Sequence, residues 1–140
     1  MGNLNKKRGV IMYYFAKHSF LFVLGGSVYY GLELLFRNYS HGSMFLLGGL
    51  CFWLCGRIGK LFEGEIPFIW QMLLCAITIT TLELIVGYLV NIKWQLQIWD
   101  YSQMPGNIYG QICIPFTVIW CFLGGIAIII DRWIENTFYI

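Results

Sequence analysis

Charged side chains are scarce in this 140-residue sequence: they make up 11% of it, against roughly 25% in ordinary soluble domains. Hydrophobic residues make up 59%, and no polar stretch is long enough to form a soluble domain beside them. A net charge of +2 is too small to indicate a nucleic-acid partner. The composition therefore predicts an integral membrane protein, with residues 1–140 forming one membrane domain and the lipid bilayer as its main partner.

Residues that bind metals or phosphates are also few. The two histidines, His18 and His41, lie at opposite ends of the first apolar run, and the five cysteines all fall within apolar runs. Cys51 and Cys55 share a helix face, but no third ligand joins them to form a zinc site. No GxxxxGK[ST] loop is present for ATP phosphates. The sequence predicts no metal, no cofactor and no enzymatic activity.

Four apolar runs are long enough to cross a bilayer, which takes about 20 residues of helix. They lie at about Phe20–Phe36, Met44–Leu61, Ile66–Ile92 and Ile108–Ile130. Helices are expected because each satisfies its own backbone polar groups in lipid. We therefore predict an all-α fold with four transmembrane helices.

The basic residues predict the orientation of these helices in the membrane. Two of them, Arg37 and Lys93, would lie on one side, and seven would lie on the other: Lys6, Lys7, Arg8, Lys17, Arg57, Lys60 and Arg132. Cytoplasmic segments carry an excess of Lys and Arg. Both termini are therefore expected in the cytoplasm.

The four spans also suggest an internal repeat. When the first span is aligned with the third, the tripeptide "LEL" around Glu33 matches "LEL" around Glu83. When the second span is aligned with the fourth, "YS" at residues 39–40 falls on "YS" at residues 101–102. We interpret the chain as two copies of one helical hairpin, at about 20–61 and 66–133.

The two matched glutamates are the main candidates for a functional site, because a carboxylate inside a span costs a few kcal/mol and normally faces protein or water. Arg37 lies one helical turn after Glu33, whereas Glu83 has no basic residue within a turn. Glu83 is expected either to be protonated or to pair across helices, with Arg37 as the nearest candidate. An ion, proton or substrate site that includes Tyr30 and Thr80, and a purely structural pair, both remain open.

Small residues recur at helical spacing on three spans, and such residues allow helix backbones to approach closely in lipid. The second span carries Gly48, Cys51, Cys55 and Gly59, and the third carries Ala76, Thr80, Gly87 and Asn91 around Glu83. The fourth carries Gly110, Cys113, Thr117, Cys121 and Gly124. Packing within the chain is the simpler interpretation, and a surface for another membrane protein is the alternative.

The two loops opposite the termini are rich in aromatic and polar residues. An interfacial aromatic belt would explain them, and a cation-binding outer vestibule is the sharper alternative because aromatic faces attract cations. The vestibule residues would be Tyr39, His41, Trp99, Asp100, Tyr101, Asn107 and Gln111.

Two motifs carry a resemblance to a known family. They are "R.YSH.SM", with Arg37, residues 39–41, Ser43 and Met44, and "WDYS..P.N..GQIC.PF", with residues 99–102, Pro105, Asn107, residues 110–113, Pro115 and Phe116. With these motifs, nearly the whole chain resembles the bacterial ABC transporter type IV permease family. The resemblance implies a transporter component in the bacterial inner membrane.

Two functions follow as alternatives. In the first, the chain acts as a small permease or channel. Its four helices are few for a pathway, so it would form a homo-oligomer, with the glutamates as ion or proton sites. In the second, it is a subunit or scaffold that binds a separate ATPase or a larger membrane protein through its small-residue helix faces.

Overall fold

The computed structural model describes residues 1–38 and 40–138, with the side chains of Phe36 and Arg37 left out. It contains four α-helices and one short π-helical segment. They are α1 (Gly2–Arg37), α2 (Gly42–Leu61), α3 (Phe68–Gly87), η1 (Tyr88–Lys93) and α4 (Ile114–Phe138). In this part of the chain the only strand-like feature is an isolated bridge between Ile108 and Ile112. The predicted all-α fold is confirmed.

Among the described residues, three helical segments are long and apolar enough to span a membrane: α2, α3 together with η1, and α4. The fourth predicted span, Phe20–Phe36, lies within the 36-residue helix α1 and is not among them, so it stays a prediction. The repeat and the cytoplasmic location of the termini also stay predictions.

The last span was placed wrongly at both ends. We predicted it at Ile108–Ile130, but α4 begins at Ile114 and continues to Phe138. The residues before it form a turn, in which Tyr109 and Gly110 have positive φ angles of 53° and 70° that no α-helix accommodates. At the other end the helix continues past Ile130, because the charged residues there, Asp131, Arg132 and Glu135, form ion pairs with other parts of the chain.

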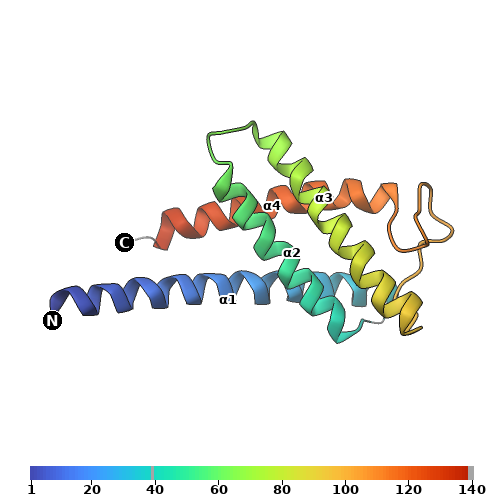
Figure 1. Ribbon diagram of the computed structural model, residues 1–140, viewed down its shortest axis with the longest axis horizontal. Helices are drawn as coiled ribbons and strands as arrows, with labels where there is room; N and C mark the ends of the chain where they lie inside the picture. Colours follow the sequence, from blue (N-terminus) through green and yellow to red (C-terminus); the bar gives the residue numbers. More distant parts are fainter. Residues whose placement is uncertain (39, 139–140) are drawn as a thin grey trace.

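Consecutive helices pair, α1 with α2 and α3 with α4, and α2 lies in the middle of the four helices (Figure 1). In this view α1 and α4 follow the long axis, and α2 and α3 cross it obliquely. Both termini lie toward one end, and the α1–α2 and α3–α4 connections lie at the other. Helix α2 packs against each of the other three helices, whereas α1 packs mainly against α2.

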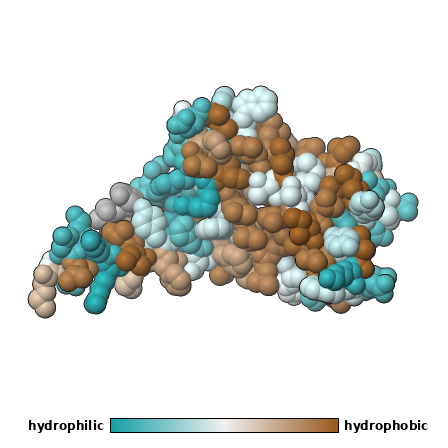
Figure 2. Space-filling model, in the orientation of Figure 1, coloured by the Kyte–Doolittle hydropathy of each residue, from teal (hydrophilic) through white to brown (hydrophobic). Residues whose placement is uncertain are grey.

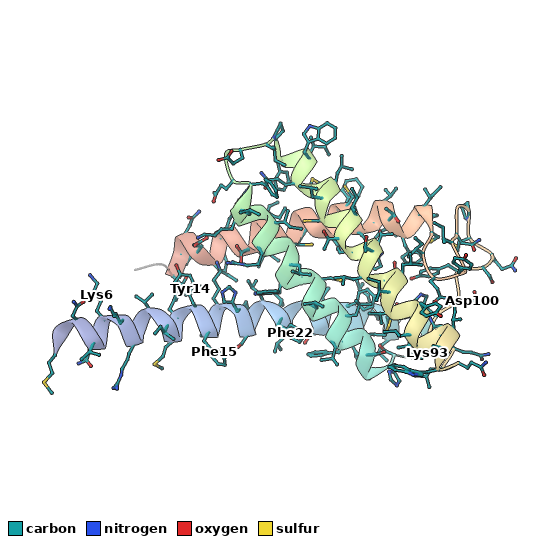
Figure 3. The ribbon with its side chains drawn as sticks, in the orientation of Figure 1. Lys6, Tyr14, Phe15, Phe22, Lys93 and Asp100 are labelled. Atoms are coloured by element: carbon teal, nitrogen blue, oxygen red, sulfur yellow. The ribbon has the colours of Figure 1, made fainter. Side chains whose placement is uncertain are left out.

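The surface has the pattern expected of a membrane protein. Figure 2 shows apolar surface over the middle of the molecule and hydrophilic surface gathered toward its ends. Lys6 lies at one of these ends, and Lys93 and Asp100 lie at the other (Figure 3).

Glycines allow the helices to approach closely where they cross. A Cβ atom on Gly48 of α2 would lie 2.5 Å from Cβ of Tyr29 on α1. A Cβ atom on Gly124 of α4 would lie 2.4 Å from Cβ of Cys75 on α3. These distances are shorter than real side chains permit, so only glycine fits at either crossing.

Candidate functional site

Glu83 is the centre of the candidate site. It lies on α3 and is only 2% exposed. Its Oε1 atom accepts a hydrogen bond of 3.1 Å from the hydroxyl of Tyr101, and its Oε2 atom accepts one of 3.0 Å from the indole N–H of Trp120. A buried carboxylate needs such donors, because an unsatisfied polar group inside a protein costs free energy. Both donors are electrically neutral, so these contacts satisfy the carboxylate oxygens without neutralising a charge.

A chain of aromatic rings holds the two donors in place. The ring of Tyr101 stacks on Phe116 with centroids 4.8 Å apart, and Phe116 lies 5.8 Å from the ring of Trp120. Trp120 in turn lies 5.4 Å from Tyr29 of α1. The α3–α4 connection, α4 and α1 therefore contribute aromatic groups around one carboxylate of α3.

Tyr101 reaches the interior because the preceding chain folds back onto the end of α3. In η1 the helix widens to π-helical hydrogen bonding, a form that is often found at functional sites. Asn91 of η1 accepts a hydrogen bond of 2.7 Å from the backbone N–H of Ile98 and donates one of 2.7 Å to Oε1 of Gln111. Trp99 donates a further bond of 3.0 Å to the backbone carbonyl of Gln111. Residues 98–111 thus form an anchored cap over the site.

The predicted vestibule residues occupy different positions. Trp99, Tyr101 and Gln111 are buried, whereas Asp100 is exposed. Asn107 is half-buried and hydrogen-bonds within its own turn, to the carbonyls of residues 102 and 104 and from the N–H of residue 110. Tyr39 lies outside the described residues. Whether any of these residues binds a cation remains a prediction.

Two of these polar residues, His41 and Asp100, accept hydrogen bonds from nearby backbone N–H groups. His41 lies before α2, where its Nδ1 atom accepts a hydrogen bond of 3.2 Å from the N–H of Ser43 and so caps the helix. Asp100 accepts a bond of 2.8 Å from the N–H of Ser102. This backbone bond lowers the pKa of the Asp100 carboxyl below its usual value, because it favours the charged form.

The other predicted members of the glutamate site are more dispersed. Thr80, one turn before Glu83 on α3, lies 3.2 Å from the hydroxyl of Thr117 on α4. Tyr30 and Glu33 are half-buried on α1. The side chain of Arg37 lies outside the described residues, so its predicted pairing with either glutamate stays a prediction. The two matched glutamates therefore have different degrees of burial.

A cavity of about 140 Å³ lies beside Glu83, between all four α-helices. Glu83 is the one charged side chain among the described residues that line it. The aromatic residues in its wall are Tyr29, Phe52 and Trp120. The remaining lining residues are small or aliphatic: Leu24, Gly25, Val28, Leu32, Leu47, Gly48, Cys51, Cys55, Ile79, Leu123, Ile126, Ala127 and Ile130.

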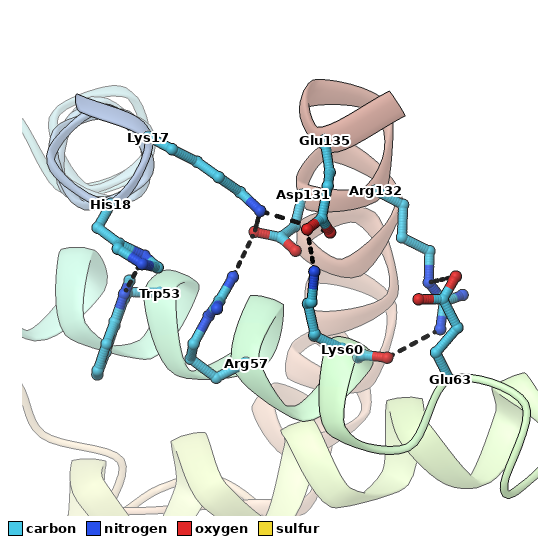
Figure 4. A network of polar contacts seen from close by, with 10 residues as sticks. Lys17, His18, Trp53, Arg57, Lys60, Glu63, Asp131, Arg132 and Glu135 are labelled. Atoms are coloured by element: carbon cyan, nitrogen blue, oxygen red, sulfur yellow. Dashed lines mark hydrogen bonds and ion pairs between the residues drawn. The ribbon is translucent and has the colours of Figure 1, made fainter. Parts of the chain in front are cut away.

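A second polar cluster, which was not predicted from the sequence, lies nearer the termini (Figure 4). Lys17 of α1 reaches two acids of α4, with its Nζ atom 3.3 Å from Asp131 and 3.7 Å from Glu135. Asp131 also pairs with Arg57 of α2 at 3.2 Å, and Glu135 pairs with Lys60 of α2. Lys17 and Asp131 are almost fully buried. We name these five residues the inner ion cluster.

Arg132 extends these contacts to the α2–α3 connection. Its guanidinium donates to the carbonyl of Gly59 at 3.0 Å and to Oε1 of Gln71 at 2.8 Å, and it lies 3.6 Å from Glu63. Gln71 is buried and donates to two backbone carbonyls of the same connection. The sequence did offer a signal for the acids, since Asp131 and Glu135 are four residues apart and so share one helix face.

The small-residue faces are used inside the chain. A Cβ atom on Gly87 would lie 2.6 Å from Oε1 of Gln111, and one on Gly110 would lie 2.9 Å from Oδ1 of Asp100. These contacts favour packing within the chain over the alternative in which Gly87 and Gly110 face another membrane protein.

The site thus presents one carboxylate to an otherwise apolar cavity, which is an arrangement suited to holding a proton or a cation. Metal binding has no support from side-chain clustering: among the described residues, no three His, Cys, Asp or Glu side chains are placed to share an ion.

Comparison with known proteins gives one match. A family model described as "Putative ABC-transporter type IV" matches residues 9–139. Neither a curated protein nor a solved structure matches the chain.

Proposed function

Because the chain belongs to the family described as "Putative ABC-transporter type IV", we propose that it is the membrane component of a transporter in which Glu83 is the proton or cation site. The observation that supports this assignment is the position of Glu83: a buried carboxylate on a helix apolar enough to span the membrane, beside a cavity that all four α-helices line. Ionisable groups at such positions are costly, and in membrane proteins they mark ion and substrate pathways.

The hydrogen bonds of Glu83 suit a group that changes its charge. Tyr101 and Trp120 both donate to it, which stabilises the ionised carboxylate. The apolar cavity on its other side favours the neutral form, because burial disfavours charge. Because the hydrogen bonds favour the charged carboxylate and the cavity favours the neutral one, Glu83 is suited to bind and release a proton as a ligand enters and leaves the cavity.

The architecture favours assembly with further chains. Four helices provide little room for a pathway of their own, so we propose a homo-oligomer in the bacterial inner membrane with both termini in the cytoplasm. The sequence contains no phosphate-binding loop, so ATP hydrolysis in an ABC-type complex would require a separate ATPase as partner. Native mass spectrometry after mild extraction should therefore detect a multiple of this chain or a complex with an ATPase, and a monomer would contradict the proposed assembly.

The proton site is tested by flux through the reconstituted protein. The full chain is placed in liposomes that contain a pH-sensitive dye, and proton entry is driven by a potassium diffusion potential. We expect Glu83→Gln to slow protein-dependent entry at least tenfold, because the amide does not take up the proton. Glu65→Gln, which changes an exposed acid in the α2–α3 connection, is the control and should leave the rate within twofold.

Two results would contradict the proposal. One is an unchanged rate for Glu83→Gln, and the other is the absence of proton entry in the unmodified protein at a verified density of folded protein in the membrane.

A further inference from the structure

The wall of the Glu83 cavity limits the kind of cation that it accepts. Inorganic cations such as Mg²⁺ or Ca²⁺ require about six or more oxygen ligands. Among the described lining residues, Glu83 supplies the only carboxylate, and both of its oxygens already accept hydrogen bonds. Aliphatic and aromatic side chains form almost all of the remaining wall. A desolvated metal ion would find too few ligands here, whereas a cation with an apolar body would contact the wall favourably.

The aromatic residues of the wall add a preference for positive charge. Tyr29 and Trp120 line the cavity, with ring centroids 5.4 Å apart, and Trp120 also donates to Glu83. Aromatic faces attract cations, most strongly where water is excluded. The carboxylate and these two rings therefore lie within one apolar enclosure.

The cavity reaches the exposed surface of the molecule between α1 and α4. Helix α1 is bridged to α4 by the Tyr29–Trp120 contact toward one end and by the Lys17–Asp131 ion pair toward the other. Between these bridges, Val28 of α1 and Ile126 of α4 both line the cavity and are 44% and 48% exposed. Because these two lining residues reach the surface, the cavity opens there between α1 and α4, and we name this opening the lateral portal. Its rim also includes Leu24, Leu123 and Ile130.

From these features we propose that the Glu83 site binds a small organic cation with apolar substituents, such as a quaternary ammonium compound, which enters from the bilayer through the lateral portal. The inference rests on the proposed site at Glu83 and adds its ligand class. The cavity volume of about 140 Å³ sets the size, since an apolar cavity of about 150 Å³ accommodates a benzene ring. The cation would lie in the cavity beside the carboxylate and against the rings of Tyr29 and Trp120.

The test compares two ligands of the same shape. The full chain in nanodiscs of zwitterionic lipid is titrated calorimetrically with ethyltrimethylammonium, which has as many heavy atoms as benzene, and, separately, with its uncharged isostere 2,2-dimethylbutane. Empty nanodiscs give the contribution of lipid partitioning, which is subtracted. We expect the cation to bind at least tenfold more tightly than the isostere. Equal affinities would overturn the proposal, because they would show that the cavity selects shape and not charge.

Two variants locate the binding. Glu83→Gln should weaken binding of the cation at least tenfold and leave the isostere within twofold, and retained isostere binding also shows that the variant is folded. Ile126→Trp places a large ring in the lateral portal and should slow association of the cation at least fivefold. Ile129→Trp changes another exposed isoleucine of α4 that does not line the cavity, and should leave association unchanged. Association rates are measured by stopped-flow mixing of the cation with the nanodiscs. An unchanged affinity of the cation for Glu83→Gln, or an unchanged association rate for Ile126→Trp, would overturn the inference.

These measurements separate the ligand class from the proposed function. If Glu83→Gln abolishes proton entry but ethyltrimethylammonium does not bind, the proton site stands and the ligand class is wrong. If the cation binds through Glu83 but proton entry is unaffected, the ligand class stands and the proposed proton site is wrong.

Discussion

Glu83 is almost fully buried, and the two groups that donate hydrogen bonds to it come from other parts of the chain. Tyr101 lies in the α3–α4 connection and Trp120 lies in α4. The position of Glu83 on a polar stripe could be predicted, because helical spacing is a local property of sequence. The identity of its donors could not, because it depends on how the connection folds back onto α3.

At this scale the hydroxyl of Tyr101 can be tested directly. Tyr101→Phe keeps the ring that stacks on Phe116 but removes the donor to Glu83, so the free energy of unfolding should fall by about 1–3 kcal/mol. Tyr109→Phe is the matched control, since Tyr109 belongs to the same connection and is 82% exposed. Reversible unfolding in mild detergent measures both. Equal stability of the two variants would show that the bond to Glu83 contributes little.

At the scale of the element, the crossings of the helices depend on small residues. The apolar runs predicted where the helices lie, because hydropathy is set by composition along the chain. They misplaced the start of α4, since residues 108–113 are apolar but turn through left-handed backbone that hydropathy does not reveal. The small-residue faces were predicted correctly as buried positions on α2, with Gly48 among them.

The crossing of α1 and α2 gives a matched pair of substitutions. Gly48→Ala would place its Cβ atom 2.5 Å from Cβ of Tyr29, so the helices must separate and stability should fall by about 1–3 kcal/mol. Gly31→Ala, on α1, meets no atom within 4 Å and should raise stability by about 0.5–1 kcal/mol, because alanine is the better helix former. Unfolding of both variants in the same detergent is the measurement, and effects of the same sign would contradict this account of the crossing.

At the scale of the whole molecule, the inner ion cluster joins α1, α2 and α4. From the sequence, the basic residues of this cluster predicted only the orientation of the helices, because the acids that face them lie beyond the predicted end of the last span. The structure assigns them a second role: Lys17 bridges α1 to α4, where the two helices have few other contacts. That pairing is non-local, so it does not follow from the hydropathy of either helix.

The inner ion cluster predicts an order of stabilities. Asp131→Asn leaves Lys17 and Arg57 without their shared acid, so it should cost about 3–5 kcal/mol. Lys17→Met should cost less, because Arg57 still pairs with Asp131 and Lys60 still pairs with Glu135. Lys6→Met, at the exposed start of α1, is the control and should have no measurable effect. Unfolding in detergent ranks the three variants, and a larger loss for Lys17→Met than for Asp131→Asn would refute this order.

The origin of the two donors to Glu83 has a consequence for biogenesis. Helices enter the membrane in the order in which they are synthesised, so α3 arrives before the ribosome has produced Trp120 and before the cap with Tyr101 has closed. The apolar residues of α3 outweigh one carboxylate, so insertion itself does not wait. The carboxylate gains both donors only after the cap has closed and α4 has docked. A chain arrested before that step would have α3 in the membrane with the Glu83 carboxylate not yet covered by the cap and α4. We expect membrane quality-control proteases to recognise such a chain by this carboxylate.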